Sequence, residues 1–108
     1  MRVLRIHKNS VDFNRGALEE LFGDSLDLKV SYMTLVLMAD KDGILQIILP
    51  RLMETLRWGK IKADNFLKLL KELGLINYSI APAQNDGKLQ VITIKFHEYQ
   101  QENDNGEE

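Results

Sequence analysis

The architecture of this chain is set by the stretch Leu56-Arg57-Trp58-Gly59-Lys60-Ile61-Lys62-Ala63, which joins two amphipathic segments with almost no linker. Residues 51–56 and residues 60–73 each place apolar side chains at helical spacing along one face. Trp58-Gly59 interrupts the first segment, and Gly74 is a stop signal for the second. The sequence therefore predicts two helices separated by a very short turn.

A third helix is predicted before this pair, over residues 27–39. Asp27 is a natural N-cap for it. Its apolar residues are spaced as on a helix and widen into a broad arc, which includes Val30, Met33, Val36 and Leu37. Because a helix this apolar is normally buried on most sides, we expect it to be the central helix of the fold.

The remaining signals in this region are of strand type. Residues 44–48 are a short apolar run closed by Pro50, which fits the first turn of the next helix. Residues 75–80 and 89–96 predict a hairpin, because the second run alternates strictly and turn formers, including Asp86-Gly87, lie between them. The order is helix, strand, helix, tight turn, helix and hairpin, which contains the helix-turn-helix arrangement.

The two ends of the chain differ from this middle part. Residues 1–9 predict a short edge strand, and residues 12–22 predict a short helix capped by Asp12, with an apolar stripe made of Ala17, Leu18, Leu21 and Phe22. Residues 98–108 hold five acidic groups and no basic one, so we expect a disordered acidic tail. The net charge of −2 is thus the sum of −5 in the tail and +3 in residues 1–97, which hold 14 basic and 11 acidic groups.

Composition excludes several classes of protein. A chain of 108 residues has room for one modest core. The absence of cysteine excludes a disulfide scaffold, a thiol nucleophile and a cysteine-based zinc site. There is no apolar run long enough to span a membrane and no signal-peptide pattern, so we expect a cytoplasmic protein without a membrane partner.

Enzyme and metal chemistry find little support in the sequence. It has no glycine-rich phosphate loop, no nucleophile–base spacing and no HExxH pair, so we expect neither catalysis nor a cofactor. Fitting Asp40-Lys41-Asp42-Gly43 to a calcium loop would place Met38 and Leu49 at ligand positions, so a plain turn is predicted. His7 and His97 have no third ligand nearby in the sequence, and we expect surface histidines rather than a metal site.

Residues 28–96 resemble the winged-helix domains. Residues 56–63 look like the turn and the start of a recognition helix, and Leu70-Lys71-Glu72-Leu73-Gly74-Leu75-Ile76 looks like the exit into the first strand of the wing. The resemblance implies an α+β fold, a winged helix-turn-helix with a three-helix core and a C-terminal β-hairpin wing. The corresponding domain would cover residues 28–97, after an N-terminal strand and helix extension over residues 1–27.

A second resemblance concerns the N-terminal part. Arg5-Ile6-His7-Lys8-Asn9, Asp24-Ser25-Leu26-Asp27-Leu28-Lys29 and the turn at residues 39–43 look like the opening of phage and plasmid replication-initiation proteins. Those proteins are similar to the winged-helix region of DnaD-type primosomal proteins and phage replisome organisers. Together the two resemblances imply double-stranded DNA binding in replication initiation or transcriptional regulation, and they fit a phage or plasmid origin.

The helix over residues 60–73 is the expected recognition helix. Its apolar residues Ala63, Phe66, Leu67 and Leu70 should point inward. At about 100° per residue, its outward face should then carry Ile61, Asp64, Asn65, Lys68 and Glu72. Between residues 51 and 71 there are six basic and two acidic groups, and this local balance of +4 suits a phosphate-binding surface.

DNA contacts are assigned to eight residues. Asn65 is suited to adenine and Lys68 to guanine in the major groove. The other six are basic and suit phosphates, either beside the groove (Lys60, Lys62, Lys71) or along the backbone (Arg51, Arg57, Lys88).

Two alternatives stay open for the outward face. Ile61 and Leu69 are apolar and would also suit a protein partner or a second subunit, while lysines can simply keep a surface helix solvated. The N-terminal additions are a further route to a homodimer, which would space two recognition helices about one turn of DNA apart. Trp58, in the turn, is expected to pack on the core rather than stack on bases.

Overall fold

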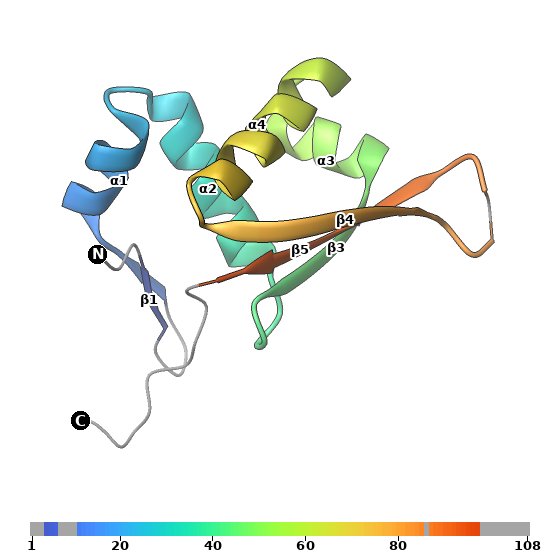
Figure 1. Cartoon of the computed structure of the whole chain (residues 1–108), viewed down its shortest axis with the longest axis horizontal. Coiled ribbons are helices and arrows are strands. Elements are labelled where there is room, and N and C mark those ends of the chain that lie inside the picture. Colours follow the sequence, from blue (N-terminus) through green and yellow to red (C-terminus); the bar gives the residue numbers. More distant parts are fainter. Residues whose placement is uncertain (1–3, 7–10, 86, 98–108) are drawn as a thin grey trace.

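The computed structural model describes residues 4–6, 11–85 and 87–97 as an α+β fold with four helices and a three-stranded antiparallel sheet (Figure 1). The elements follow one another as β1 (Leu4–Ile6), β2 (Val11–Phe13), α1 (Arg15–Phe22), α2 (Leu26–Met38), β3 (Ile44–Ile48), α3 (Leu49–Leu56), α4 (Lys60–Glu72), β4 (Ile76–Pro82) and β5 (Gln90–Phe96). The predicted elements from residue 27 to residue 96 are therefore all present, with their ends shifted by a few residues.

Strand β5 lies at the centre of the sheet, between β3 and β4. Ile94 is paired with Leu45 of β3 on one side and with Tyr78 of β4 on the other, and both pairings are antiparallel. Because successive side chains of a strand alternate between the two faces, Ile92, Ile94 and Phe96 all point to the same, buried face. The sheet thus packs against the helices with one face only.

The helices fill the other side of the core. The four apolar residues of α4 that were predicted to point inward are all buried, which confirms that prediction: Ala63, Phe66, Leu67 and Leu70. In α2 the ring of Tyr32 lies between two other aromatic rings, 5.7 Å from Phe22 of α1 and 6.0 Å from Phe96 of β5. The first contact is tilted and the second is edge-on, and together they tie the N-terminal helix to the sheet through α2.

Two predicted helix caps are wrong. Asp27 does not cap α2, because the helix begins earlier: the hydroxyl of Ser25 accepts a hydrogen bond from the backbone N–H of Leu28 at 3.3 Å. Asp27 instead lies in the first turn, where its charge favours the helix dipole. Asp12 does not cap α1, because it belongs to strand β2. The side chain of Asn14 accepts from the N–H of Ala17 at 3.0 Å in its place.

The N-terminal strand predicted within residues 1–9 is present as β1, and it has its own partner. β1 pairs with β2, a strand that the sequence did not predict, and this two-stranded sheet is separate from the main one. The acidic tail predicted over residues 98–108, and with it any statement on its order, lies outside the described residues.

Helix α2 is less buried than its composition predicts. Val36 is buried as expected, but Val30 is 46% exposed and Leu37 is 64% exposed. The buried side of the helix is formed by Ser31, Tyr32, Leu35 and Val36. The apolar residues of α2 are spread over nearly all sides of the helix, but the described part of the chain packs against only one of those sides.

The hairpin of β4 and β5 extends past the helices (Figure 1). Along the inner face of β4, Ile76 is buried, Tyr78 is half-buried and Ile80 is 46% exposed. β4 runs to Pro82, two residues beyond the predicted strand end. The outer part of the hairpin is therefore not packed against the helices and is exposed to solvent.

The predicted turn before β3 is present. The carboxylate of Asp40 accepts hydrogen bonds from the backbone N–H groups of Asp42 at 2.9 Å and Ile44 at 3.0 Å, so it serves the turn itself. In residues 4–6, 11–85 and 87–97, no three acidic, histidine or cysteine side chains come together as a metal site. No helix in that part of the chain is long and apolar enough to cross a membrane.

The orientation of α4 can be tested with two substitutions on the same helix. Leu67→Ala should lower the free energy of unfolding by about 2 to 5 kcal/mol, because it leaves a cavity in a fully buried site. Ile61→Ala should change it by less than about 0.5 kcal/mol, because Ile61 is 78% exposed. Urea unfolding followed by circular dichroism measures both, and equal losses would contradict the orientation.

Candidate nucleic-acid interface

The solvent face of α4 is the centre of the candidate site. The helix begins after Gly59, and its four inward residues fix which side faces water. Ile61, Asn65 and Lys68 are exposed on that side, with Glu72 following in the last turn, and Leu69 is half-buried at the edge. Asn65 and Lys68 have no hydrogen bond or ion pair with any described residue, so their polar groups are available to a ligand.

One flank of this face carries Lys60. Its Nζ atom lies 3.9 Å from Oδ2 of Asp64, one helical turn further on, and both side chains are partly in solvent. An exposed pair at this spacing contributes little to stability. Its main effect is on the charge of the surface, because Asp64 neutralises part of the positive field that Lys60 would offer to a phosphate.

The other flank carries Lys62, which lies over the ring of Trp58. The Nζ atom is 4.5 Å from the ring centroid, a cation–π distance. The indole in turn meets Phe66 edge-on, with centroids 5.1 Å apart and planes at 86°. Trp58 is half-buried against the core, which confirms the predicted packing role. The turn and the first two turns of α4 are thus held together around one indole ring.

The end of α4 is linked to the hairpin by a weaker contact. The Nζ atom of Lys71 lies 5.9 Å from the ring centroid of Tyr78 on β4. This places a lysine of the helix beside the base of the hairpin. Tyr78 is a residue that sequence reasoning missed, because a tyrosine in a predicted strand carries no signal for a particular partner.

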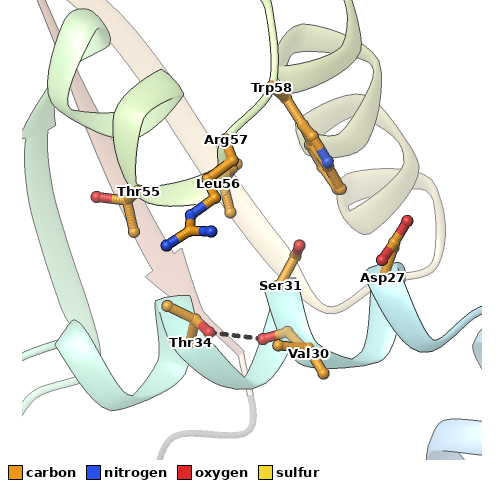
Figure 2. Close-up of a pocket in the computed structure, with 8 residues that line it drawn as sticks. All are labelled: Asp27, Val30, Ser31, Thr34, Thr55, Leu56, Arg57 and Trp58. Carbon is orange, nitrogen blue, oxygen red and sulfur yellow. Dashed lines mark hydrogen bonds between the residues drawn. The ribbon is translucent and has the colours of Figure 1, made fainter.

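Arg57 lies elsewhere, in the turn before α4. Its backbone is left-handed, with φ of 60° and ψ of 37°, and it is the C-cap of α3. Its guanidinium group extends toward α2, into a hollow of about 220 Å³ (Figure 2). The hollow is lined mostly by polar side chains, which Figure 2 labels: Asp27, Val30, Ser31, Thr34, Thr55, Leu56, Arg57 and Trp58.

The structure brings together five of the eight predicted contact residues and separates the other three. Lys60, Lys62, Asn65, Lys68 and Lys71 share the solvent side of α4. The others occupy three different places: Arg51 is exposed in the first turn of α3, Arg57 borders the hollow beside α2, and Lys88 is exposed in the turn that closes the hairpin.

The contact between Lys62 and Trp58 can be tested without DNA. Lys62→Met removes the charge and keeps most of the side-chain length, so it should cost about 0.5 to 1 kcal/mol of unfolding free energy and change the emission of the single tryptophan. Lys68→Met makes the same chemical change on the same helix away from the ring, and it should leave the emission unchanged. An identical response from both variants would contradict the contact.

Comparison with known proteins gives no relative on which a function could be based. The sequence matches no protein-family model, and no curated protein and no solved structure matches it. The function of α4 and of the hairpin therefore has to follow from their own residues.

Proposed function

We propose that this chain is a winged-helix protein that binds double-stranded DNA, with α4 as its recognition helix and the β4–β5 hairpin as its wing. The order of elements from α2 to β5 supports this proposal, as does the short connection between α3 and α4. The pairing of β3 with the last strand closes the three-stranded sheet beside the helices. The hairpin extends beyond them (Figure 1), where a wing would contact a neighbouring stretch of duplex.

The observation that carries the proposal is the division of α4 into two faces. One face is completely buried, and the other presents Asn65 and Lys68 to solvent with no partner among the described residues. The major groove of B-DNA is about 12 Å wide and admits an α-helix. A helix with this division can enter the groove without losing any contact with its own core.

The residues of this face have distinct roles in the proposal. The amide of Asn65 can pair with both N6 and N7 of adenine, and Lys68 can donate to O6 and N7 of guanine. Ile61, one turn before Asn65 on the same exposed side, suits the methyl group of thymine. Phosphates would be bound by the remaining basic residues, which are Lys60, Lys62 and Lys71 on the helix and Arg51, Arg57 and Lys88 around it.

A second candidate function is protein binding through the same face. The observation that favours it is the 78% exposure of Ile61, with Leu69 half-buried nearby. Burial of an isoleucine against a partner protein would be favourable by about 1.5 to 3 kcal/mol. The two candidates differ in their dependence on salt, because phosphate binding releases counterions and apolar docking does not. The process served by DNA binding, replication initiation or transcription, follows only from the resemblances.

DNA binding should show a steep dependence on salt. Titration of the protein with mixed-sequence duplex DNA at several salt concentrations gives the slope of log Kobs against log salt. Each phosphate contact adds about −0.9 to that slope. The double variant Lys62→Ala, Lys68→Ala should flatten it by about one contact, because Lys62 is assigned to a phosphate and Lys68 to a base.

A matched control removes two positive charges at other places. The double variant Lys41→Ala, Lys95→Ala changes an exposed residue in the turn between α2 and β3 and another on the open face of β5, and it should leave the slope nearly unchanged. An equal effect of this control would show that only net charge matters. Absence of binding at low salt, with and without residues 98–108, would reject the proposal.

Asp64 gives a test in the opposite direction. Asp64→Asn removes a negative charge from the proposed interface and releases Lys60 from its 3.9 Å pair. Since exposed charge pairs are worth about 0.2 to 1 kcal/mol, the affinity for duplex DNA should rise by about 1.4- to five-fold. The same change at Asp42, in the turn before β3, should have no such effect. Weaker binding by Asp64→Asn would contradict the placement of α4 against DNA.

A further inference from the structure

The solvent side of α2 carries an apolar stripe of which the described residues cover only one member, Met33, and that one in part. The stripe consists of Leu26, Val30, Met33 and Leu37, at intervals of four, three and four residues. Leu26 is 69% exposed, and Val30 and Leu37 are exposed as described above, while Met33 is half-buried. At about 100° per residue these four side chains fall within one narrow strip, opposite to the side that faces the core.

This composition is unusual for a surface helix. Only Asp27 and Lys29 carry a charge between residues 26 and 38. A surface helix normally has charged and polar residues opposite its apolar face, and a helix that is apolar all round is normally buried. Contiguous exposed apolar surface commonly marks an interaction site. The stripe therefore calls for a covering partner of similar apolar character.

We propose that the cover is a second copy of this chain, whose α2 packs antiparallel on the stripe about a two-fold axis. The intervals of four, three and four read the same in both directions, so reversal of the helix superimposes the stripe on itself. Leu26 of one copy then lies opposite Leu37 of the other, and Val30 lies opposite Met33. A two-fold interface requires this kind of self-complementary patch, and the spacing is that of the apolar seam of paired helices.

Charges beside the stripe support the same arrangement. The hollow of Figure 2 runs along one side of α2, with Asp27 toward the N-terminal end and Arg57 over the half that contains Thr34. Neither Asp27 nor Arg57 has an ion pair within the described residues. A two-fold axis perpendicular to α2 reverses the direction of the helix and leaves the hollows of both copies on the same flank of the interface. Asp27 of each copy is therefore brought toward Arg57 of the other.

The hollow also holds a buried polar group that needs a partner. The side chain of Ser31 is buried, with 8% of the residue exposed, and it lines the hollow. Its hydroxyl has no hydrogen-bond partner among the described residues. Buried polar groups are nearly always paired. A carboxylate from the second copy entering the hollow beside Arg57 would supply an acceptor for this hydroxyl.

Other covers fit the stripe less well. Residues 100–108 contain no apolar side chain, so this segment cannot replace the water that covers the leucines. A membrane surface is recognised by helices with several Lys or Arg residues on the polar side, and α2 has one lysine. The proposed dimer does not depend on DNA binding, and its tests need no nucleic acid.

The dimer is tested by sedimentation velocity of the full chain over a range of concentrations. We expect a concentration-dependent dimer, and we expect Leu37→Glu to weaken it at least tenfold by placing a charge against Leu26 of the other copy. Because Leu37 is exposed in the monomer, circular dichroism should show an unchanged fold. Ile61→Glu puts the same charge on an exposed isoleucine of α4 and should leave the dimer intact.

Three results would overturn the proposal. They are a native protein that is monomeric at every concentration, a dimer that survives Leu37→Glu, and a dimer that is lost in Ile61→Glu but not in Leu37→Glu. The last result would place self-association on α4.

The orientation can be tested separately because the native chain has no cysteine. The antiparallel arrangement predicts that Leu26→Cys and Leu37→Cys form a disulfide-linked dimer when the two variants are mixed, and not when either is oxidised alone. Cross-linking of each variant with itself would indicate a parallel pair and contradict the proposal.

The exchange of charges in the double variant Asp27→Arg, Arg57→Asp tests the ion pair between the copies. It should restore a dimer that each single change weakens, and failure to restore the dimer would refute that ion pair.

Discussion

The fold depends on one strand that is paired on both sides. β5 is the last element of the sheet in sequence and the central one in space, so it joins β3, which comes before the two short-linked helices, to β4, which follows them. Its buried residues Ile92 and Ile94 meet the helices on one face only. Because the helices lie on that single face, α4 packs with its apolar side toward the sheet and must present its polar side to solvent. The candidate interface is thus a consequence of the position of β5.

Much of this could be predicted from periodicity and turn residues. The strict alternation of residues 89–96 indicated β5, and the helical spacing of the apolar residues in α4 identified its buried side correctly. Gly74 was expected to end α4, and its positive φ of 78° shows why a residue without a Cβ is needed there. The candidate contacts on α4 followed from the same spacing: Asn65 and Lys68 are exposed on its outward face, and Lys60 and Lys62 lie on opposite flanks of that face.

The errors have physical causes. Ser25 and Asp27 are both good N-caps, and the choice between them depends on where the preceding turn ends, at Gly23 with φ of 63°. Periodicity also cannot tell which side of a helix is covered when apolar residues lie on all sides, so Val30 and Leu37 were expected to be buried. The direction in which the Arg57 side chain points depends on its left-handed backbone conformation, and no local sequence pattern predicts that conformation for an arginine.

The exposed features of the chain divide between two helices. α4 combines exposed amide and lysine side chains with an opposite face that is buried in the core, and we propose it as the DNA-binding helix. α2 exposes an apolar stripe, which we propose as the contact with a second copy. The most direct measurement of the central claim is an NMR titration with a short mixed-sequence duplex. Amide shifts should change along α4 and in the hairpin turn around Lys88, and stay constant in α1 and on the open sheet face at Gln46 and Thr93. Changes confined to α1 or α2, or none at low salt, would contradict it.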